Sequence, residues 1–254
     1  MGELFQLRRG VIPAGDVHDL TQFRNLVRAT CDLEGIVGYK VGALLGLTYG
    51  LPRVVAIVKE YTDLPVIYDH QKAGTDIPHL GEKFARVCAE AGISGVIIFP
   101  QAGPETEMAF IDAILAEGLV PMVGGEMTQP RYMAKDGGFI RDSAPLEIYQ
   151  LAAARGVEHF ILPGTKPAMM NRYHTVLSAL VKEPKYSMPG IGRQGGEITV
   201  AFAAVGAAPA YAIVGASIYE QADMRSAAQR YCDEALSTID RREVAWAGRR
   251  RKSR

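Results

Sequence analysis

Short apolar runs rich in valine and isoleucine recur along the chain and are separated by longer stretches with helical spacing. Eight runs are candidate strands: GVIPAG (10–15), GIVGYKVG (35–42), LPVIYD (64–69), GVIIFP (95–100), LVPMVGG (119–125), HFILPG (159–164), KYSMPGIG (185–192) and YAIVGAS (211–217). Their apolar residues are mostly continuous rather than alternating, which is typical of strands covered on both faces, as in parallel sheets.

The stretches between these runs predict amphipathic helices over 80–92, 105–118, 146–156 and 227–242, and Gly92 and Gly156 are stop signals. Strands and helices alternating in this way predict an α/β protein with a (β/α)8 TIM barrel fold. An open doubly wound sheet is the alternative, but it needs a glycine-rich turn after its first strand, which GVIPAGDVHD does not supply. We expect one barrel domain over residues 1–241 and a basic, solvated tail over 242–254.

Composition narrows the function classes. The chain has 254 residues, 48% hydrophobic and 22% charged, with a formal net charge of zero, so no global field attracts nucleic acid or an acidic membrane. No apolar window is long enough to span a membrane, and the N-terminal MGELFQLRRG does not resemble a signal peptide. Cys31, Cys88 and Cys232 are too far apart to suggest a disulfide framework or a zinc site. These features predict a cytoplasmic protein with no nucleic-acid or membrane partner.

Charged residues gather where the first three predicted strands end. Asp16 follows the first, Lys40 lies in the second, and YDHQKAGTDIP brings Asp69, Lys72 and Asp76 after the third. Unpaired ions at the rim of an apolar core are costly, so this group is either a structural ion cluster or an active site. Barrels of this kind carry their chemistry at the carboxyl ends of the strands. Alternating acids and lysines favour an active site, because each charge stabilises the ionised form of its neighbour.

Glycine-rich segments follow the last two strands, where such barrels commonly bind phosphate. GIGRQGG spans Gly190–Gly196, and VGAS spans Val214–Ser217. Glycines let backbone N–H groups approach an anion, and Arg193 offers a forked cation. GIGRQG also matches the dinucleotide pattern G-x-G-x-x-G, but it comes late in the chain and lacks the acidic residue expected after it. An ordinary loop remains the alternative. A further loop, 131–145, has a composition that suits folding over a site.

Together these residues resemble those of the orotidine 5′-phosphate decarboxylase family. The matching motifs are Asp16 in GDV, Lys40 in YKVG, the Asp69, Lys72 and Asp76 group, and Gln194 in GIGRQGG. EMTQP (126–130) resembles the segment whose serine or threonine binds the pyrimidine, which nominates Thr128, and IVGASIY resembles the closing strand. We expect the substrate-binding residues to be Asp16, Thr128, Arg193, Gln194, Gly195, Gly215 and Ala216, of which Arg193 is nominated from the glycine-rich loop rather than from the family pattern.

The resemblance implies decarboxylation of orotidine 5′-phosphate (OMP) to UMP, in UMP biosynthesis, with no metal and no organic cofactor. Lys72 would stabilise the carbanion-like centre and deliver a proton, with Asp69 facing the substrate carboxylate. Asp16 and Lys40 would hold the charge network and the ribose hydroxyls. The family also implies a homodimer in which Asp76 completes the partner subunit's site.

The chain departs from the family pattern in two places. The family has one residue between the first Asp and Lys and two between Lys and the second Asp, whereas this chain has two and three. A regular strand would turn Lys72 away from the face of Asp69, so we expect a bulge or turn near Gly74. The family also carries a phosphate-binding Arg where this chain has Ala216, and Arg193 is the candidate replacement.

Two other functions stay open. A magnesium-dependent sugar-phosphate decarboxylase or aldolase of the same superfamily would carry Glu-Val-Gly at the second strand, where this chain has Lys40. A phosphometabolite-binding barrel without catalytic activity is the other, because the stretched motif changes the spacing of the catalytic groups.

Overall fold

Eight parallel strands form the centre of the molecule in a computed structural model that describes residues 3–71 and 76–239. The strands are β1 (Arg9–Pro13), β2 (Tyr39–Gly42), β3 (Val66–Asp69), β4 (Gly95–Ile98), β5 (Val120–Gly124), β6 (His159–Ile161), β7 (Lys185–Met188) and β8 (Ala210–Val214). They follow the order β1-β8-β7-β6-β5-β4-β3-β2. Each lies within or overlaps one predicted run.

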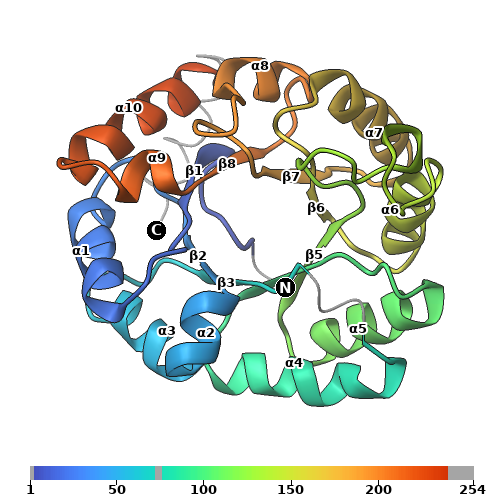
Figure 1. Cartoon of the computed structure of the whole chain (residues 1–254), viewed down its shortest axis with the longest axis horizontal. Helices are drawn as coiled ribbons and strands as arrows, with labels where there is room; N and C mark the ends of the chain where they lie inside the picture. Colours follow the sequence, from blue (N-terminus) through green and yellow to red (C-terminus); the bar gives the residue numbers. More distant parts are fainter. Residues whose placement is uncertain (1–2, 72–75, 240–254) are drawn as a thin grey trace, which may run out of the picture.

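Backbone hydrogen bonds between β1 and the β2 segment close the sheet into a barrel. Val11 N donates to Gly35 O at 2.8 Å, and Gly15 N donates to Lys40 O at 2.8 Å. The strand ring is visible end-on in Figure 1. The predicted (β/α)8 barrel is therefore confirmed.

Helices surround the strands on the outside (Figure 1). They are α1 (Leu20–Thr30), α2 (Ala43–Tyr49), α3 (Leu51–Lys59), α4 (Gly81–Glu90), α5 (Pro104–Ala116), α6 (Ala144–Ala154), α7 (Pro167–Leu180), α8 (Ile198–Ala203), α9 (Ala216–Tyr219) and α10 (Met224–Ser237), with short 3-10 turns η2 (Pro78–Leu80) and η3 (Ala134–Asp136). The four predicted helices correspond to α4, α5, α6 and α10. Gly92 and Gly156 follow α4 and α6 with φ of 80° and 83°, a left-handed conformation that favours glycine after a helix.

The strands bury apolar side chains on both faces, which explains their continuous apolar sequence. One set packs between strands and helices, as Val11, Val41 and Val96 do. The other set fills the barrel and includes Ile12, Ile67, Ile97, Met122, Ile161 and Ile213. This two-residue alternation makes the interior a packed core rather than a channel, so polar chemistry is confined to the barrel ends.

The predicted division at residue 241 falls outside the described residues, as does the basic tail 242–254, and that division stays a prediction. In residues 3–71 and 76–239, no helix has the length and apolar character needed to cross a membrane.

Candidate active site

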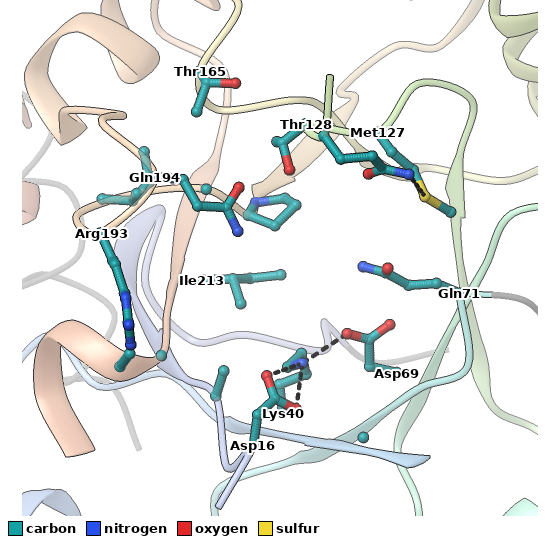
Figure 2. A pocket seen from close by; sticks show the side chains of 18 of the residues that line it. Asp16, Lys40, Asp69, Gln71, Met127, Thr128, Thr165, Arg193, Gln194 and Ile213 are labelled. Carbon is teal, nitrogen blue, oxygen red and sulfur yellow. Dashed lines mark hydrogen bonds and ion pairs between the residues drawn. The ribbon is translucent and has the colours of Figure 1, made fainter. Parts of the chain in front are cut away.

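A cavity of about 1010 Å³ opens at the carboxyl ends of the strands. Figure 2 shows its polar side chains converging from separate loops: Lys40 and the acids on one side, Arg193 and Gln194 on another, and Thr128 opposite the acids. Of the residues nominated from the sequence, it is lined by Asp16, Lys40, Asp69, Thr128, Arg193, Gln194, Gly215 and Ala216.

Lys40 is the centre of an ion cluster at this mouth. Its Nζ donates to Asp16 at 2.8 and 3.1 Å and to Asp69 Oδ2 at 2.7 Å. The lysine is buried, and β2 and β3 pair so that Gly42 lies opposite Asp69. A Cβ at position 42 would come within 2.8 Å of Asp16 Oδ1, so glycine there leaves room for the carboxylate.

The ammonium charge of Lys40 is fixed by its surroundings. Burial alone lowers the pKa of Lys40, but the attraction of Asp69 and Asp16, together with their hydrogen bonds, outweighs it and raises the pKa above its usual value. Lys40 therefore holds the two carboxylates as a permanent cation rather than exchanging a proton near neutral pH. Asp69 Oδ1 is buried and has no hydrogen-bond partner in the described part of the chain, so it can face a ligand.

The stretched third-strand motif is described only in part. Lys72 lies outside the described residues, as does Gly74, so the expected bulge stays a prediction. Asp76 is exposed, its Oδ1 accepts from Ile77 N at 2.7 Å, and its carbonyl accepts from Thr106 Oγ1 at 2.9 Å. Asp76 does not line the cavity of its own chain.

The glycine-rich loop forms the opposite wall. Gly190, Gly192 and Gly195 have φ of 93°, 82° and 90°, and a Cβ at position 192 would lie 2.5 Å from Ser217 Oγ. Glycine at position 192 therefore lets this loop approach the segment that follows β8. Gly195 itself does not line the cavity, unlike the other predicted substrate-binding residues.

Arg193 lines this wall but is paired within the protein. Its guanidinium donates to Glu220 Oε1 at 2.7 Å, and the side chains are 68% and 52% exposed. An exposed pair of this kind is weak, so a phosphate that enters the cavity can compete for the guanidinium at low cost.

Glu126 and Lys166, which follow β5 and β6, bind each other instead of facing the cavity. Lys166 Nζ donates to Glu126 Oε1 at 2.7 Å and to Met127 O at 3.1 Å, and the Tyr173 hydroxyl donates to the second oxygen of Glu126. Glu126 is almost fully buried. This cluster holds the start of the segment that presents Thr128 to the cavity.

Sequence reasoning did not assign several lining residues, among them Gln71, Phe99, Met127, Gln129, Ile213 and Tyr219. Of these, only Gln71 had a usable sequence signal: it is two residues after Asp69, so in an extended strand it faces the same side. The loop over 131–145 contributes no lining residue, and the lining from that part of the chain ends at Pro130.

Comparisons with known proteins identify the family of this chain. The model of the "Orotidine 5′-phosphate decarboxylase / HUMPS family" matches residues 10–231. The chain is 31% identical to orotidine 5′-phosphate decarboxylase of Pyrococcus abyssi, covering 88% of this chain and 98% of that one. It is 32% identical to the enzyme of the same name from Thermococcus kodakarensis, covering 90% and 98%.

A solved structure shares the fold. It is orotidine 5′-monophosphate decarboxylase from Methanocaldococcus jannaschii, complexed with inhibitor BMP, with a TM-score of 0.77 and 23% identity over 89% of this chain and 98% of that one. The family model matches most of the barrel, and both relatives are more than 30% identical over most of this chain. The chain belongs to the orotidine 5′-phosphate decarboxylase / HUMPS family.

Proposed function

We propose that this chain decarboxylates OMP to UMP, a carbon-carbon lyase reaction, in the cavity at the carboxyl end of its barrel. One observation carries the proposal most strongly: a buried Lys40 bridges Asp16 and Asp69 on one side of a cavity whose other side is a glycine-rich loop with Arg193. The curated relatives above 30% identity bear the same activity in their names. A small-molecule ligand is also supported by the inhibitor bound to the M. jannaschii protein.

Substrate would lie across the cavity. The phosphate would be bound by Arg193, by Gln194 and by the segment at Gly215 and Ala216, far from the reacting bond. Binding energy gained there is available to hold the pyrimidine against the charged side. The ribose hydroxyls would contact Asp16 and Lys40, and Thr128 would bind the pyrimidine. Gly195 supports this loop by its backbone conformation rather than by direct contact.

Decarboxylation would use the charge arrangement directly. The Asp69 oxygen without a partner would face the substrate carboxylate, so that repulsion is relieved when CO2 leaves C6. Lys72, which follows in the motif, would stabilise the carbanion-like centre and deliver a proton to it. Lys40 would keep Asp69 in place throughout.

The magnesium-dependent alternative fits these residues poorly. A divalent cation prefers oxygen ligands, and an ammonium bound to the same carboxylates opposes its binding. Here the Lys40 ammonium already lies within 2.8 Å of both Asp16 and Asp69, where a metal would be repelled. We therefore propose a reaction without a metal, and the family resemblance implies no organic cofactor.

A homodimer is part of the proposal. Asp76 is exposed and away from its own cavity, so its role in catalysis requires a second copy of the chain. Exposed apolar side chains of α2 and of the segment after β3 offer a surface for that copy: Leu44, Leu47 and Ile77 are 45%, 84% and 50% exposed. We also propose a cytoplasmic location, which the three unpaired cysteines support.

A nucleotide-binding barrel without catalytic activity is the second candidate, favoured by the two additional residues in the motif.

Product analysis separates these functions. Purified protein is incubated with OMP in EDTA, and in parallel with a β-keto sugar-acid phosphate and Mg²⁺, and the products are identified by mass spectrometry. UMP from the first reaction alone is expected. A decarboxylated sugar phosphate from the second alone would overturn the proposal, and binding of UMP without turnover in either would favour the barrel without catalytic activity.

A further inference from the structure

The conformation of β3 continues beyond its last residue. His70 N donates to Ile97 O of β4 at 3.1 Å, so pairing with the neighbouring strand extends one residue past Asp69. Side chains of a strand alternate between its two faces. Tyr68 packs outward in the core between strands and helices, whereas Asp69 faces the mouth.

His70 follows Tyr68 on the outer side. Its Nδ1 lies 2.8 Å from the Tyr68 hydroxyl, and its ring packs against Phe84 of α4 in a tilted arrangement, with centroids 5.0 Å apart. These contacts anchor the backbone at the point where the motif departs from the family spacing. They also determine the direction of the next side chain.

Gln71 is consequently the next inward position after Asp69. It lines the cavity, and Figure 2 shows its carboxamide pointing into the cavity from the side opposite Gln194. In residues 3–71 and 76–239 the carboxamide has no hydrogen-bond partner. A carboxamide offers two donors and one acceptor oxygen, which match a ring edge carrying neighbouring C=O and N–H groups.

We propose that Gln71 hydrogen-bonds the pyrimidine ring of the substrate and thereby contributes to base specificity. The inference rests on the proposed function, because it takes the ligand to be a pyrimidine nucleotide. Arg193 and Gln194 occupy the opposite wall, so Gln71 lies at the base end of the ligand rather than at its phosphate. A polar contact of this kind discriminates between ligands, since a ligand without the matching groups leaves the carboxamide unpaired.

The test compares two ligands that differ in the base. Dissociation constants of UMP and of ribose 5-phosphate are measured by calorimetry for the wild type, for Gln71→Met and for Gln229→Met. Met preserves the length of Gln but not its hydrogen bonds. Gln229 lies on α10, is half-buried like Gln71, and donates from its carboxamide to Asp233 Oδ1. Thermal midpoints are recorded for all three proteins.

We expect Gln71→Met to weaken UMP binding about tenfold, which is the usual effect of losing one hydrogen bond. The dissociation constant of ribose 5-phosphate should stay within about twofold of its wild-type value. Gln229→Met should change neither. An unchanged dissociation constant of UMP for Gln71→Met, or equal weakening of the binding of both ligands, would overturn the inference. Failure of the proposed function is distinguishable: a wild type that binds UMP without converting OMP leaves this comparison valid, whereas a wild type that does not bind UMP refutes both.

Discussion

Lys40 Nζ lies 2.7 Å from Asp69 Oδ2, and each side chain is 8% exposed. Removing one partner of such a pair leaves the other charge buried and uncompensated. Lys40→Met should therefore reduce the free energy of unfolding by about 3 kcal/mol, in addition to abolishing activity. Denaturant unfolding measures the first effect and OMP turnover the second.

The double variant Lys40→Met/Asp69→Asn is the control for that prediction. It removes both buried charges, so most of the lost stability should return while activity stays absent. Equal stability of the single variant and the wild type would show that the pair contributes nothing to the fold. Equal instability of the single and double variants would mean that packing, rather than charge, is responsible.

Arg193 and Glu220 form an exposed pair whose loss should cost little stability. Arg193→Ala is expected to change the free energy of unfolding by less than about 1 kcal/mol but to raise KM for OMP at least about tenfold, because the phosphate loses its forked cation. Glu220→Gln is the matched variant. It frees the guanidinium, so KM should stay equal or fall. An unchanged KM for Arg193→Ala would refute its role as the phosphate ligand.

Glu107, in the first turn of α5, is buried, and its Oε1 has no hydrogen-bond partner in the described part of the chain. Burial raises the pKa of Glu107 to about 8 from its usual 4.5. Between these values the folded protein holds a proton that the unfolded chain has released, so stability falls as pH rises through this window. The thermal midpoint of Glu107→Gln, measured relative to the wild type, should increase from pH 5 to pH 8. A constant difference between the thermal midpoints of the variant and the wild type across that range would contradict the raised pKa of Glu107.

The shared site of the proposed dimer has a direct test by subunit mixing. Lys72→Ala and Asp76→Asn should each be inactive alone. In a mixed dimer one site would receive both altered residues and the other would receive the natural Lys72 and Asp76. Refolding the two variants together should therefore restore activity, and refolding each alone should not. Absence of activity in mixtures shown to contain the mixed dimer would place both residues in one subunit's site.

The barrel could be predicted because each strand has a recognisable local sequence pattern. Runs such as GVIIFP and YAIVGAS are apolar on both faces, and glycines such as Gly92 end the helices between them. The positions of Asp16, Lys40 and Asp69 at the mouth followed from the rule that strand ends converge. These statements depend on local pattern and on the fold class alone.

Other features depend on contacts between distant residues. Arg193 pairs with Glu220 and Lys166 pairs with Glu126, and no spacing in the sequence indicates either ion pair. Strand alternation from Asp69 indicates an inward position at Gln71. That this alternation continues past the end of β3 depends on the contacts of His70 with Tyr68 and Phe84, which the sequence does not show.

The measurement that tests the central claim most directly is the ultraviolet absorbance of OMP mixed with purified protein in EDTA, beside the Lys72→Ala variant. We predict that the absorbance of OMP falls with the wild type and stays constant with the variant, because Lys72 supplies the proton and the reaction needs no metal. Unchanged absorbance with the wild type, or equal consumption by both proteins, would contradict the account.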